Sequence, residues 1–327
     1  MQNILSIHIT DRCNSACCFC VVSAPDFAVD SVNYDDVVSF LRDSAGREYN
    51  IVNLHGGEPT MHPRLIELLG TIRDLGYREV HLQTNGLRLA DQSFAAALVN
   101  SGVTTFIVSL HGDRSEVHDP QCGVAGGLAR TLQCIRNLKA LGAQVRTNTV
   151  VTRQNVDRLV EICQLAWQLQ VDQVNLSNLH PVGRAEPTTN AVMATFEEMR
   201  GPVYCAVDEA FRSGRRISLE GFPFCVIRER MKLDIAEGGR HIRMFVRGLV
   251  LEDYDRFMLA NRMFGPPCVD CAVRDMCGGV YPAYVESYGW SQISPIIRTN
   301  QSSSEQEPLP ERKTVSRFDV PVGNLCQ

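Results

Sequence analysis

Three cysteines near the amino terminus have the type and spacing of a metal-binding group. Cys13, Cys17 and Cys20 follow a C-x3-C-x2-C pattern directly after the first strand-like run of the chain. Three thiolates can hold three irons of a cubane iron–sulfur cluster, and the fourth iron is then open to a substrate or cofactor. Structural zinc would require a fourth ligand nearby, and the next Cys or His pair lies far along the chain. The spacing therefore favours iron–sulfur chemistry, with zinc or buried thiols as alternatives.

A second group of thiols lies near the carboxyl end. Cys268, Cys271 and Cys277 follow a C-x2-C-x5-C pattern, preceded by Cys225. Four thiolates can saturate an iron–sulfur cluster or a zinc ion. Cys225 is the favoured fourth ligand. Cys326 would require an ordered tail, and an open iron that binds substrate is the third alternative.

The pattern of apolar residues predicts the elements that position these groups. Short β-branched runs alternate with helical patterns through the first two thirds of the chain, which indicates repeated βα units and a parallel sheet. The expected strands are residues 4–10, 51–55, 79–84, 104–110, 144–152 and 173–177. The expected helices include residues 63–75, 94–101, 127–141 and 156–169. In a parallel barrel the active site lies at the carboxyl ends of the strands.

The cysteine triplet and the six βα units together resemble the radical S-adenosylmethionine (SAM) superfamily. The resemblance covers roughly residues 1–215 and implies an α/β fold, a partial (β/α)6 TIM-like barrel. The second cysteine pattern resembles the SPASM and twitch extensions, which carry auxiliary 4Fe-4S clusters, and we expect such a domain over 216–290. A SPASM domain with two auxiliary clusters would continue with a C-x3-C motif, which does not follow Cys277. One auxiliary cluster is therefore expected, and with the first cluster this makes two 4Fe-4S clusters in the chain. Residues 291–327, rich in Ser, Gln, Glu and Pro, are expected to form a flexible tail.

The resemblance also implies which residues bind SAM. The run Gly56-Gly57-Glu58-Pro59 resembles the family's GGEP motif, which contacts the amino group of SAM, although a Gly-Gly pair alone is more often a turn. Phe19 resembles the aromatic residue beside the adenine. The remaining candidates are Thr84, Asn85, Ser109, Asn148, Gly183 and Arg184.

Several of these candidates have an ordinary structural alternative. Ser109 is preferred because His111 replaces the acid usual in the family. Asn148 is equally compatible with hydrogen bonding inside the barrel. Arg184, in a segment that resembles the family's Pro-x-Gly-x-Ala, would pair with the SAM carboxylate or simply be solvated.

By this resemblance the protein is an oxidoreductase or synthase. An external electron donor such as flavodoxin or ferredoxin reduces the first cluster. SAM then yields a 5'-deoxyadenosyl radical that abstracts hydrogen from the substrate, and the auxiliary cluster assists oxidation or binds substrate. Cys122 lies in the loop after the fourth strand and could return a hydrogen atom, as in radical epimerases, although a loop cysteine without a special role is the commoner case.

No motif in the sequence identifies the substrate. No peptide-binding domain precedes the triplet, which favours a small-molecule or natural-product substrate. A ribosomal peptide, modified by a RiPP maturase or epimerase, is the second alternative. A non-catalytic zinc-binding interaction protein is the third.

Composition restricts the partners and the compartment. The 327 residues carry a formal net charge of -5 and no basic run, so nucleic acid is not an expected partner. No apolar run is long enough to cross a membrane. The chain has 13 cysteines but opens with no signal peptide, so a reducing cytoplasm is expected.

Overall fold

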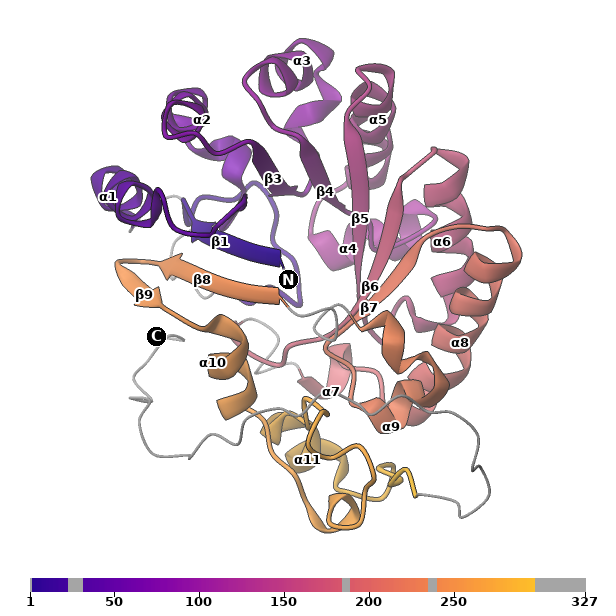
Figure 1. Cartoon of the computed structure of the whole chain (residues 1–327). Coiled ribbons are helices and arrows are strands. Elements are labelled where there is room, and N and C mark those ends of the chain that lie inside the picture. The colour runs from indigo at the N-terminus through magenta and orange to yellow at the C-terminus, as the bar shows by residue number, and fades with distance from the viewer. Residues whose placement is uncertain (1, 23–31, 184–188, 235–239, 298–327) are drawn as a thin grey trace.

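One curved sheet organises the computed structural model, which describes residues 2–22, 32–183, 189–234 and 240–297 (Figure 1). Within these residues the sheet has nine strands in the order β7-β6-β5-β4-β3-β2-β1-β8-β9. Every neighbouring pair from β7 to β8 is parallel, and β9 pairs antiparallel with β8. The strands are β1 (Gln2–His8), β2 (Ile51–His55), β3 (Glu79–Thr84), β4 (Thr105–Ser109), β5 (Gln144–Val151), β6 (Gln173–Asn178), β7 (Ile217–Glu220), β8 (Arg240–Val246) and β9 (Leu249–Leu251).

Helices surround the outer face of this sheet, as Figure 1 shows for α1, α2, α3, α5, α6 and α8. The α-helices are α1 (Tyr34–Ser44), α2 (Leu65–Asp74), α3 (Gln92–Asn100), α4 (Ser115–Cys122), α5 (Gly127–Ala140), α6 (Leu159–Gln168), α7 (Thr189–Val192), α8 (Phe196–Arg212), α9 (Phe224–Ile227), α10 (Tyr254–Ala260) and α11 (Pro282–Tyr288). None of those in the described part of the chain combines the length and apolar character needed to cross a bilayer.

Side chains along each strand point alternately to the two faces of the sheet, so that apolar residues lie on its outer face and polar residues on its inner face. In β1, Leu5 and Ile7 are fully buried, while Ser6 lies on the opposite face. Ser6 accepts a hydrogen bond there from the side chain of Asn53 on β2. The outer face therefore packs against the helices, and polar side chains line the lumen of the barrel.

The predicted open α/β barrel of parallel strands is confirmed, and β7 and β8 add two parallel strands to the six that were predicted. These two strands lie beyond residue 215, in the part of the chain predicted to form the second domain, and that division stays a prediction. Strands β2 and β3 have the predicted bounds, whereas β1 begins and ends two residues earlier than predicted.

The barrel is open between β7 and β8, which are not neighbours in the sheet. Arg240 on β8 reaches Glu220 at the end of β7, with 3.5 Å between Nη1 and Oε1. The same guanidinium contacts Asp255 on α10, with 3.2 Å between Nη2 and Oδ1. An ionic cluster therefore spans the side on which the sheet does not close.

The carboxyl-terminal part of the described chain is anchored to α8. Tyr284 on α11 is 1% exposed and stacks on Phe196, with 3.7 Å between ring centroids. The backbone N–H of Phe196 donates to the Tyr284 hydroxyl at 2.8 Å. These contacts fix the segment that carries the second group of cysteines against the barrel, where Figure 1 shows α10 and α11 below the strands.

Candidate functional site

The loop that carries the first three cysteines is held on one side by the loop after β2. The Gly57 N–H donates to the Thr10 carbonyl, and the Glu58 N–H donates to the Arg12 carbonyl, both at 2.7 Å. A Cβ on Gly56, whose φ is +152°, would lie 2.3 Å from the Thr10 oxygen. The two predicted glycines therefore let the backbones of the two loops approach closely, and their contact with SAM stays a prediction.

The end of α4 holds the other side of the cysteine loop. The Ala16 N–H donates to the Cys122 carbonyl at 2.9 Å, and the Cys18 N–H donates to the Gln121 carbonyl at 3.0 Å. Gly123 follows in the left-handed region with φ +66°, and a Cβ there would lie 3.0 Å from the Ala16 oxygen. The loop is thus fixed through its backbone, independently of any bound metal.

A third contact involves another predicted position, Gly183. A Cβ on this residue, whose φ is +65°, would lie 2.6 Å from the carbonyl oxygen of Cys20. The segment after β6 therefore closes over the end of the cysteine loop, and only glycine fits there. Arg184, the next predicted residue, lies outside the described residues.

The three thiols of the loop are close enough to affect one another and are partly exposed. Burial raises the pKa of Cys13 to about 12, and the negative charges of Glu58, Cys17 and Cys20 add to this rise. Binding of a metal cluster would have to displace the protons. Across the described residues, no group of three His, Cys, Asp or Glu side chains is arranged to hold an ion as it stands. The loop fits a cluster by its donors and by its fixed backbone.

The carboxylate of Glu58 joins three of the predicted residues. It is 1% exposed and accepts hydrogen bonds from the Thr84 hydroxyl and the Asn85 N–H, both at 2.7 Å. It also accepts from the N–H and hydroxyl of Thr60 at 3.1 and 2.7 Å. Burial raises the pKa of Glu58, and these four donors oppose that rise. Glu58 therefore ties the loop after β2 to the end of β3.

We expect Glu58→Gln to lower the free energy of unfolding by about 1–3 kcal/mol, because an amide NH2 would face donors where the carboxylate now accepts. Chemical denaturation under anaerobic conditions measures this change. Glu67→Gln is the matched control, since the Glu67 carboxylate is exposed and pairs with Arg64, and its effect should stay within about 0.5 kcal/mol. Equal losses for the two variants would contradict the assignment.

Asn85 connects the third strand to the cysteine loop. Its Nδ2 donates to Asn14 Oδ1 at 2.7 Å and to Ser15 Oγ at 3.2 Å. Its Oδ1 accepts from the Leu87 N–H at 3.0 Å. Both ends of the side chain are thus engaged within the protein, and the predicted contact of Asn85 with SAM remains untested.

Aromatic rings pack behind the cysteine loop. Phe19 is 8% exposed and meets His111 edge-on, with 4.6 Å between ring centroids. His111 Nδ1 accepts from the Val150 N–H at 3.2 Å, and burial lowers the pKa of His111 to about 3. His111 therefore acts as a neutral, buried partner of Phe19.

Cys122 lies in this same packed region. Its side chain is 6% exposed, and its Sγ is 3.9 Å from Nε2 of His118. The backbone bond from Ala16 places Cys122 directly behind the cysteine loop.

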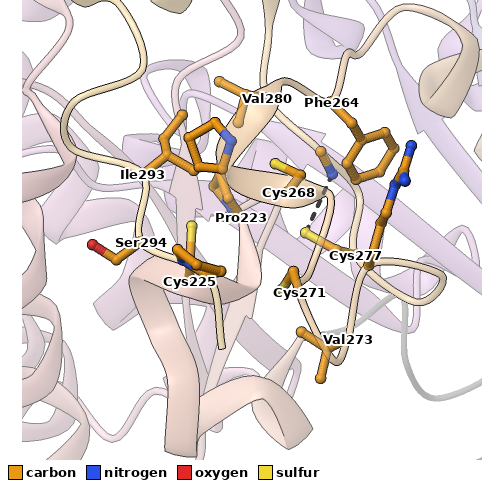
Figure 2. Close-up of a pocket in the computed structure, with 14 residues that line it drawn as sticks. Pro223, Cys225, Phe264, Cys268, Cys271, Val273, Cys277, Val280, Ile293 and Ser294 are labelled. Atoms are coloured by element: carbon orange, nitrogen blue, oxygen red, sulfur yellow. Dashed lines mark hydrogen bonds between the residues drawn. The ribbon is translucent and has the colours of Figure 1, made fainter. Parts of the chain in front are cut away.

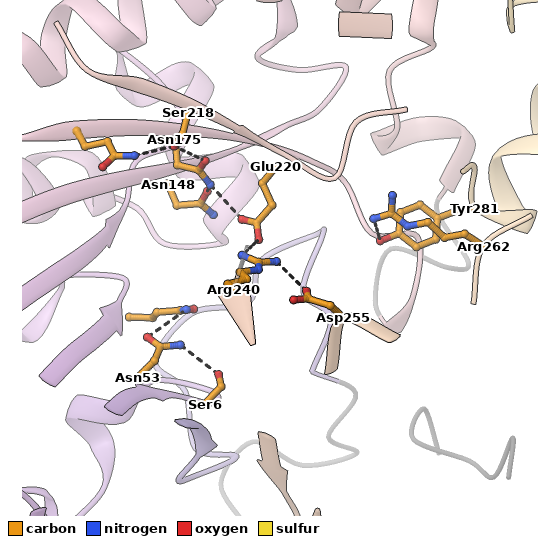
Figure 3. A network of polar contacts seen from close by, with 12 residues as sticks. Ser6, Asn53, Asn148, Asn175, Ser218, Glu220, Arg240, Asp255, Arg262 and Tyr281 are labelled. Atoms are coloured by element: carbon orange, nitrogen blue, oxygen red, sulfur yellow. Dashed lines mark hydrogen bonds and ion pairs between the residues drawn. The ribbon is translucent and has the colours of Figure 1, made fainter. Parts of the chain in front are cut away.

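Amide side chains line the lumen beside the predicted Asn148 (Figure 3). Asn175 donates to Asn148 Oδ1 at 2.8 Å and to Glu220 Oε2 at 3.1 Å. Ser218 donates to Asn175 Oδ1 at 2.8 Å. Ser109 is in register with Asn148 on the neighbouring strand. The lumen thus offers both hydrogen-bond donors and acceptors.

The opposite wall of the lumen carries a shorter chain of polar contacts. Gln83 on β3 donates to Asn53 Oδ1 at 3.4 Å, and Asn53 donates to Ser6 Oγ at 3.2 Å. Sequence reasoning missed this group and also missed Asn175 and Glu220. The alternation within predicted strand 173–177 could have found Asn175, but Glu220 lies on a strand that was not predicted.

The second group of thiols converges on one cavity (Figure 2). Cys225 on α9 lines it together with Cys268, Cys271 and Cys277. Burial raises the pKa of Cys225 to about 12, and the charges of the other three thiols contribute to this rise. Cys225, the favoured fourth ligand, is thus brought together with the C-x2-C-x5-C cysteines, whereas Cys326 lies outside the described residues.

Backbone amides point at the sulfurs of this cavity. The N–H groups of Phe224 and Gly279 both donate to Cys277 Sγ at 3.4 Å. The Ile296 N–H donates to Cys271 Sγ at 3.5 Å. Hydrogen bonds to sulfur stabilise thiolate charge and tune metal clusters. Four thiols and three such bonds fit a cluster or a zinc ion.

Known proteins resemble this chain in sequence and in fold. Residues 7–166 match the model of the radical SAM superfamily. A relative named "Probable GTP 3',8-cyclase", from Saccharolobus islandicus, is 32% identical over 180 residues, which are 55% of this chain and 58% of the relative. A protein of the same name from Sulfolobus acidocaldarius is 32% identical over 55% of this chain and 56% of the relative. The chain thus spans little more than half the length of these relatives.

Solved structures resemble the fold. SuiB from Streptococcus suis superposes with a TM-score of 0.61 at 18% identity, covering 90% of this chain and 72% of that chain. The enzyme anSMEcpe, solved with bound AdoMet and a peptide, gives a TM-score of 0.54 at 18% identity over 67% of this chain and 64% of that chain. The family match thus identifies residues 7–166 as a radical SAM domain, and the solved structures share its open parallel barrel.

Proposed function

We propose that the protein is a radical SAM enzyme that binds a 4Fe-4S cluster through Cys13, Cys17 and Cys20 and abstracts hydrogen from a substrate held in the barrel lumen. When bound and reduced, the cluster supplies the electron that splits SAM into methionine and a 5'-deoxyadenosyl radical. The observation that carries the proposal is the cysteine loop itself. It is fixed by backbone bonds at the carboxyl end of β1, beside a polar lumen.

The chain's own residues position the reaction and exclude water. The close approach of Gly183 to the Cys20 carbonyl closes one side of the loop. Phe19 and His111 form an apolar wall behind it. The buried Glu58 network fixes the loop that the family uses for the amino group of SAM. Such preorganisation brings a reactive carbon to one C–H bond and keeps competing hydrogen donors away.

The second part of the proposal is an auxiliary 4Fe-4S cluster on Cys225, Cys268, Cys271 and Cys277, within a domain over about residues 216–290. Four converging thiols with backbone N–H donors support it. The cluster would assist oxidation of the substrate or bind it. A zinc ion on the same thiols is the alternative, and a zinc protein would purify colourless, without iron or sulfide.

A small-molecule or natural-product substrate is the favoured class, with an external donor such as flavodoxin or ferredoxin supplying electrons. The amide-rich lumen suits a substrate that both donates and accepts hydrogen bonds. A ribosomal peptide is the second candidate, because one neighbour by fold was solved with a precursor peptide. Binding measurements with nucleoside metabolites and with peptides would separate the two classes.

Anaerobic reconstitution with iron and sulfide, followed by SAM and a reductant, tests the proposal directly. We expect about eight irons per chain, from two four-iron clusters, and 5'-deoxyadenosine detected by chromatography. A protein that stays pale, or that binds iron but never cleaves SAM, would overturn it.

We further propose that, where the auxiliary cluster binds the substrate rather than oxidising it, Cys122 returns a hydrogen atom to the substrate radical; the thiyl radical left on Cys122 then takes an electron from the external donor and a proton from water. Its place behind the cysteine loop and its contact with His118 support this role. Turnover in heavy water should then place deuterium in the product, as measured by mass spectrometry. Cys122→Ala should lose product while still forming 5'-deoxyadenosine, and full turnover by this variant would refute the role.

A further inference from the structure

Two arginines reach the open side of the barrel, and they differ in their partners (Figure 3). Arg240 is paired with the carboxylates of Glu220 and Asp255. Arg262, just after α10, donates from Nη1 to the Gly221 carbonyl at 3.2 Å and from Nη2 to the Tyr281 hydroxyl at 2.9 Å. Both of these acceptors are neutral, and no acidic side chain among the described residues forms an ion pair with Arg262.

The guanidinium of Arg262 keeps unused hydrogen-bonding capacity. It has five N–H donors, two of which bind the neutral acceptors, and its Nε is buried without a partner in the described structure. A partly buried cation without an anion is unfavourable, because its charge has lost water and gained no opposite charge. An anionic ligand would supply that charge.

A second donor faces the same place beside Gly221. This residue directly follows β7 and has a φ of +75°, and a Cβ on it would lie 3.3 Å from Arg262 Nη2 and 3.5 Å from His180 Nε2. Asn178, which is 5% exposed, borders the same space. Its Nδ2 donates to the Gly221 carbonyl at 3.2 Å, and its Oδ1 has no partner. Two nitrogen groups therefore converge beside the backbone of Gly221, where a side chain would crowd them.

The electrostatics of His180 fit this arrangement. Burial and, to a smaller extent, the positive charge of Arg262 lower the pKa of His180 to about 4. The imidazole is therefore neutral near pH 7 and can donate one N–H to an anion. Its ring also contacts Tyr281, with 5.2 Å between centroids, so that Tyr281 touches both Arg262 and His180.

We propose that Arg262 and His180 bind an anionic group of the substrate, a carboxylate or a phosphate, with Tyr281 holding the guanidinium in place. Arg262 also lies next to the second thiol group, because a Cβ on Gly278, beside Cys277, would lie 2.9 Å from its Nη1. A substrate anchored there by its charged end would extend into the lumen. This assignment rests on the proposed function only in taking the lumen as the substrate site.

Titration calorimetry on the reconstituted holoenzyme tests the site with inorganic phosphate and with acetate. SAM is kept present to fill its own carboxylate site, and chloride keeps the ionic strength constant. We expect Arg262→Gln to weaken binding of the preferred anion by about tenfold to a hundredfold, the loss expected from charge-assisted hydrogen bonds. Arg256→Gln on α10, an exposed position, is the matched control and should bind as the wild type does. The anion that binds with the higher affinity indicates whether the substrate group is a phosphate or a carboxylate.

A measurement on the unmutated protein covers the case in which the variant misfolds. Phenylglyoxal modifies accessible arginines, and the preferred anion should protect Arg262 but not Arg256, as read by peptide mass spectrometry. Absence of binding by the wild type, unchanged binding by Arg262→Gln, or no protection would each overturn the site. Iron content and 5'-deoxyadenosine are measured on the same samples. Loss of SAM cleavage with intact anion binding would therefore count against the proposed function and leave the anion site standing.

Discussion

Replacing Cys13, Cys17 and Cys20 together by alanine should abolish 5'-deoxyadenosine formation and leave about four irons per chain, those of the auxiliary cluster. Alanine offers no ligand, and the cluster that would cleave SAM cannot bind without thiolates. Iron and sulfide analysis and chromatography of the SAM products measure the two effects. We expect activity to fall to background, because the variant lacks the cluster that would pass the donor's electron to SAM.

The structure provides a control within the same segment. Cys18 lies off the ligand spacing, and its backbone N–H donates to Gln121. Cys18→Ala should therefore keep about eight irons and should still cleave SAM. If the triple variant kept all its iron, or if Cys18→Ala lost as much, the three thiols would not be the ligands.

Unfolding does not explain the expected loss. The cysteine loop is held through backbone atoms, by the bonds from Gly57 to Thr10, from Glu58 to Arg12 and from Ala16 to Cys122. None of these bonds uses a cysteine thiol. Circular dichroism of the triple variant should therefore resemble that of the cluster-free wild-type protein.

The six strands that the sequence predicted share a local signal. Strand β2 is a short, mostly apolar run and β3 alternates apolar with polar residues; turn residues follow both at once, and their bounds match the prediction. Strand β7 also alternates, but over only four residues, and β8 mixes Arg and His with its apolar residues, so neither was predicted. The pairing of β8 with β1 brings a strand from late in the chain beside the first strand, and no local pattern could reveal it.

The candidate site divides in a similar way. Spacing identified both groups of cysteines, because ligand geometry constrains nearby residues directly. The Gly56-Gly57 pair was predicted to contact SAM, and the structure adds a hydrogen bond from the Gly57 N–H to the Thr10 carbonyl. The approach of Gly183 to Cys20 and the pairing of Glu220 with Arg240 depend on how distant strands curve toward each other. Such contacts are visible only once the barrel is formed.

Replacing Cys268, Cys271 and Cys277 together by alanine should stop formation of the product but leave cleavage of SAM intact. Iron should fall from about eight to about four per chain, because Cys225 alone cannot hold a cluster. Cleavage of SAM to 5'-deoxyadenosine should continue, since the first cysteine loop is attached to other elements. Formation of the oxidised product should stop if the auxiliary cluster accepts the substrate's electron or binds the substrate.

Cys205→Ala is the matched control, because Cys205 is exposed on α8 and away from the cavity. It should keep both iron content and product formation. If the triple variant instead loses zinc with no change in iron, the cavity is a structural zinc site. The backbone N–H groups that donate to the cysteine sulfurs would then stabilise the thiolates around a tetrahedral zinc ion rather than a redox-active cluster. The count of irons that disappear with these three thiols therefore decides whether this segment takes part in electron transfer or only stabilises the fold.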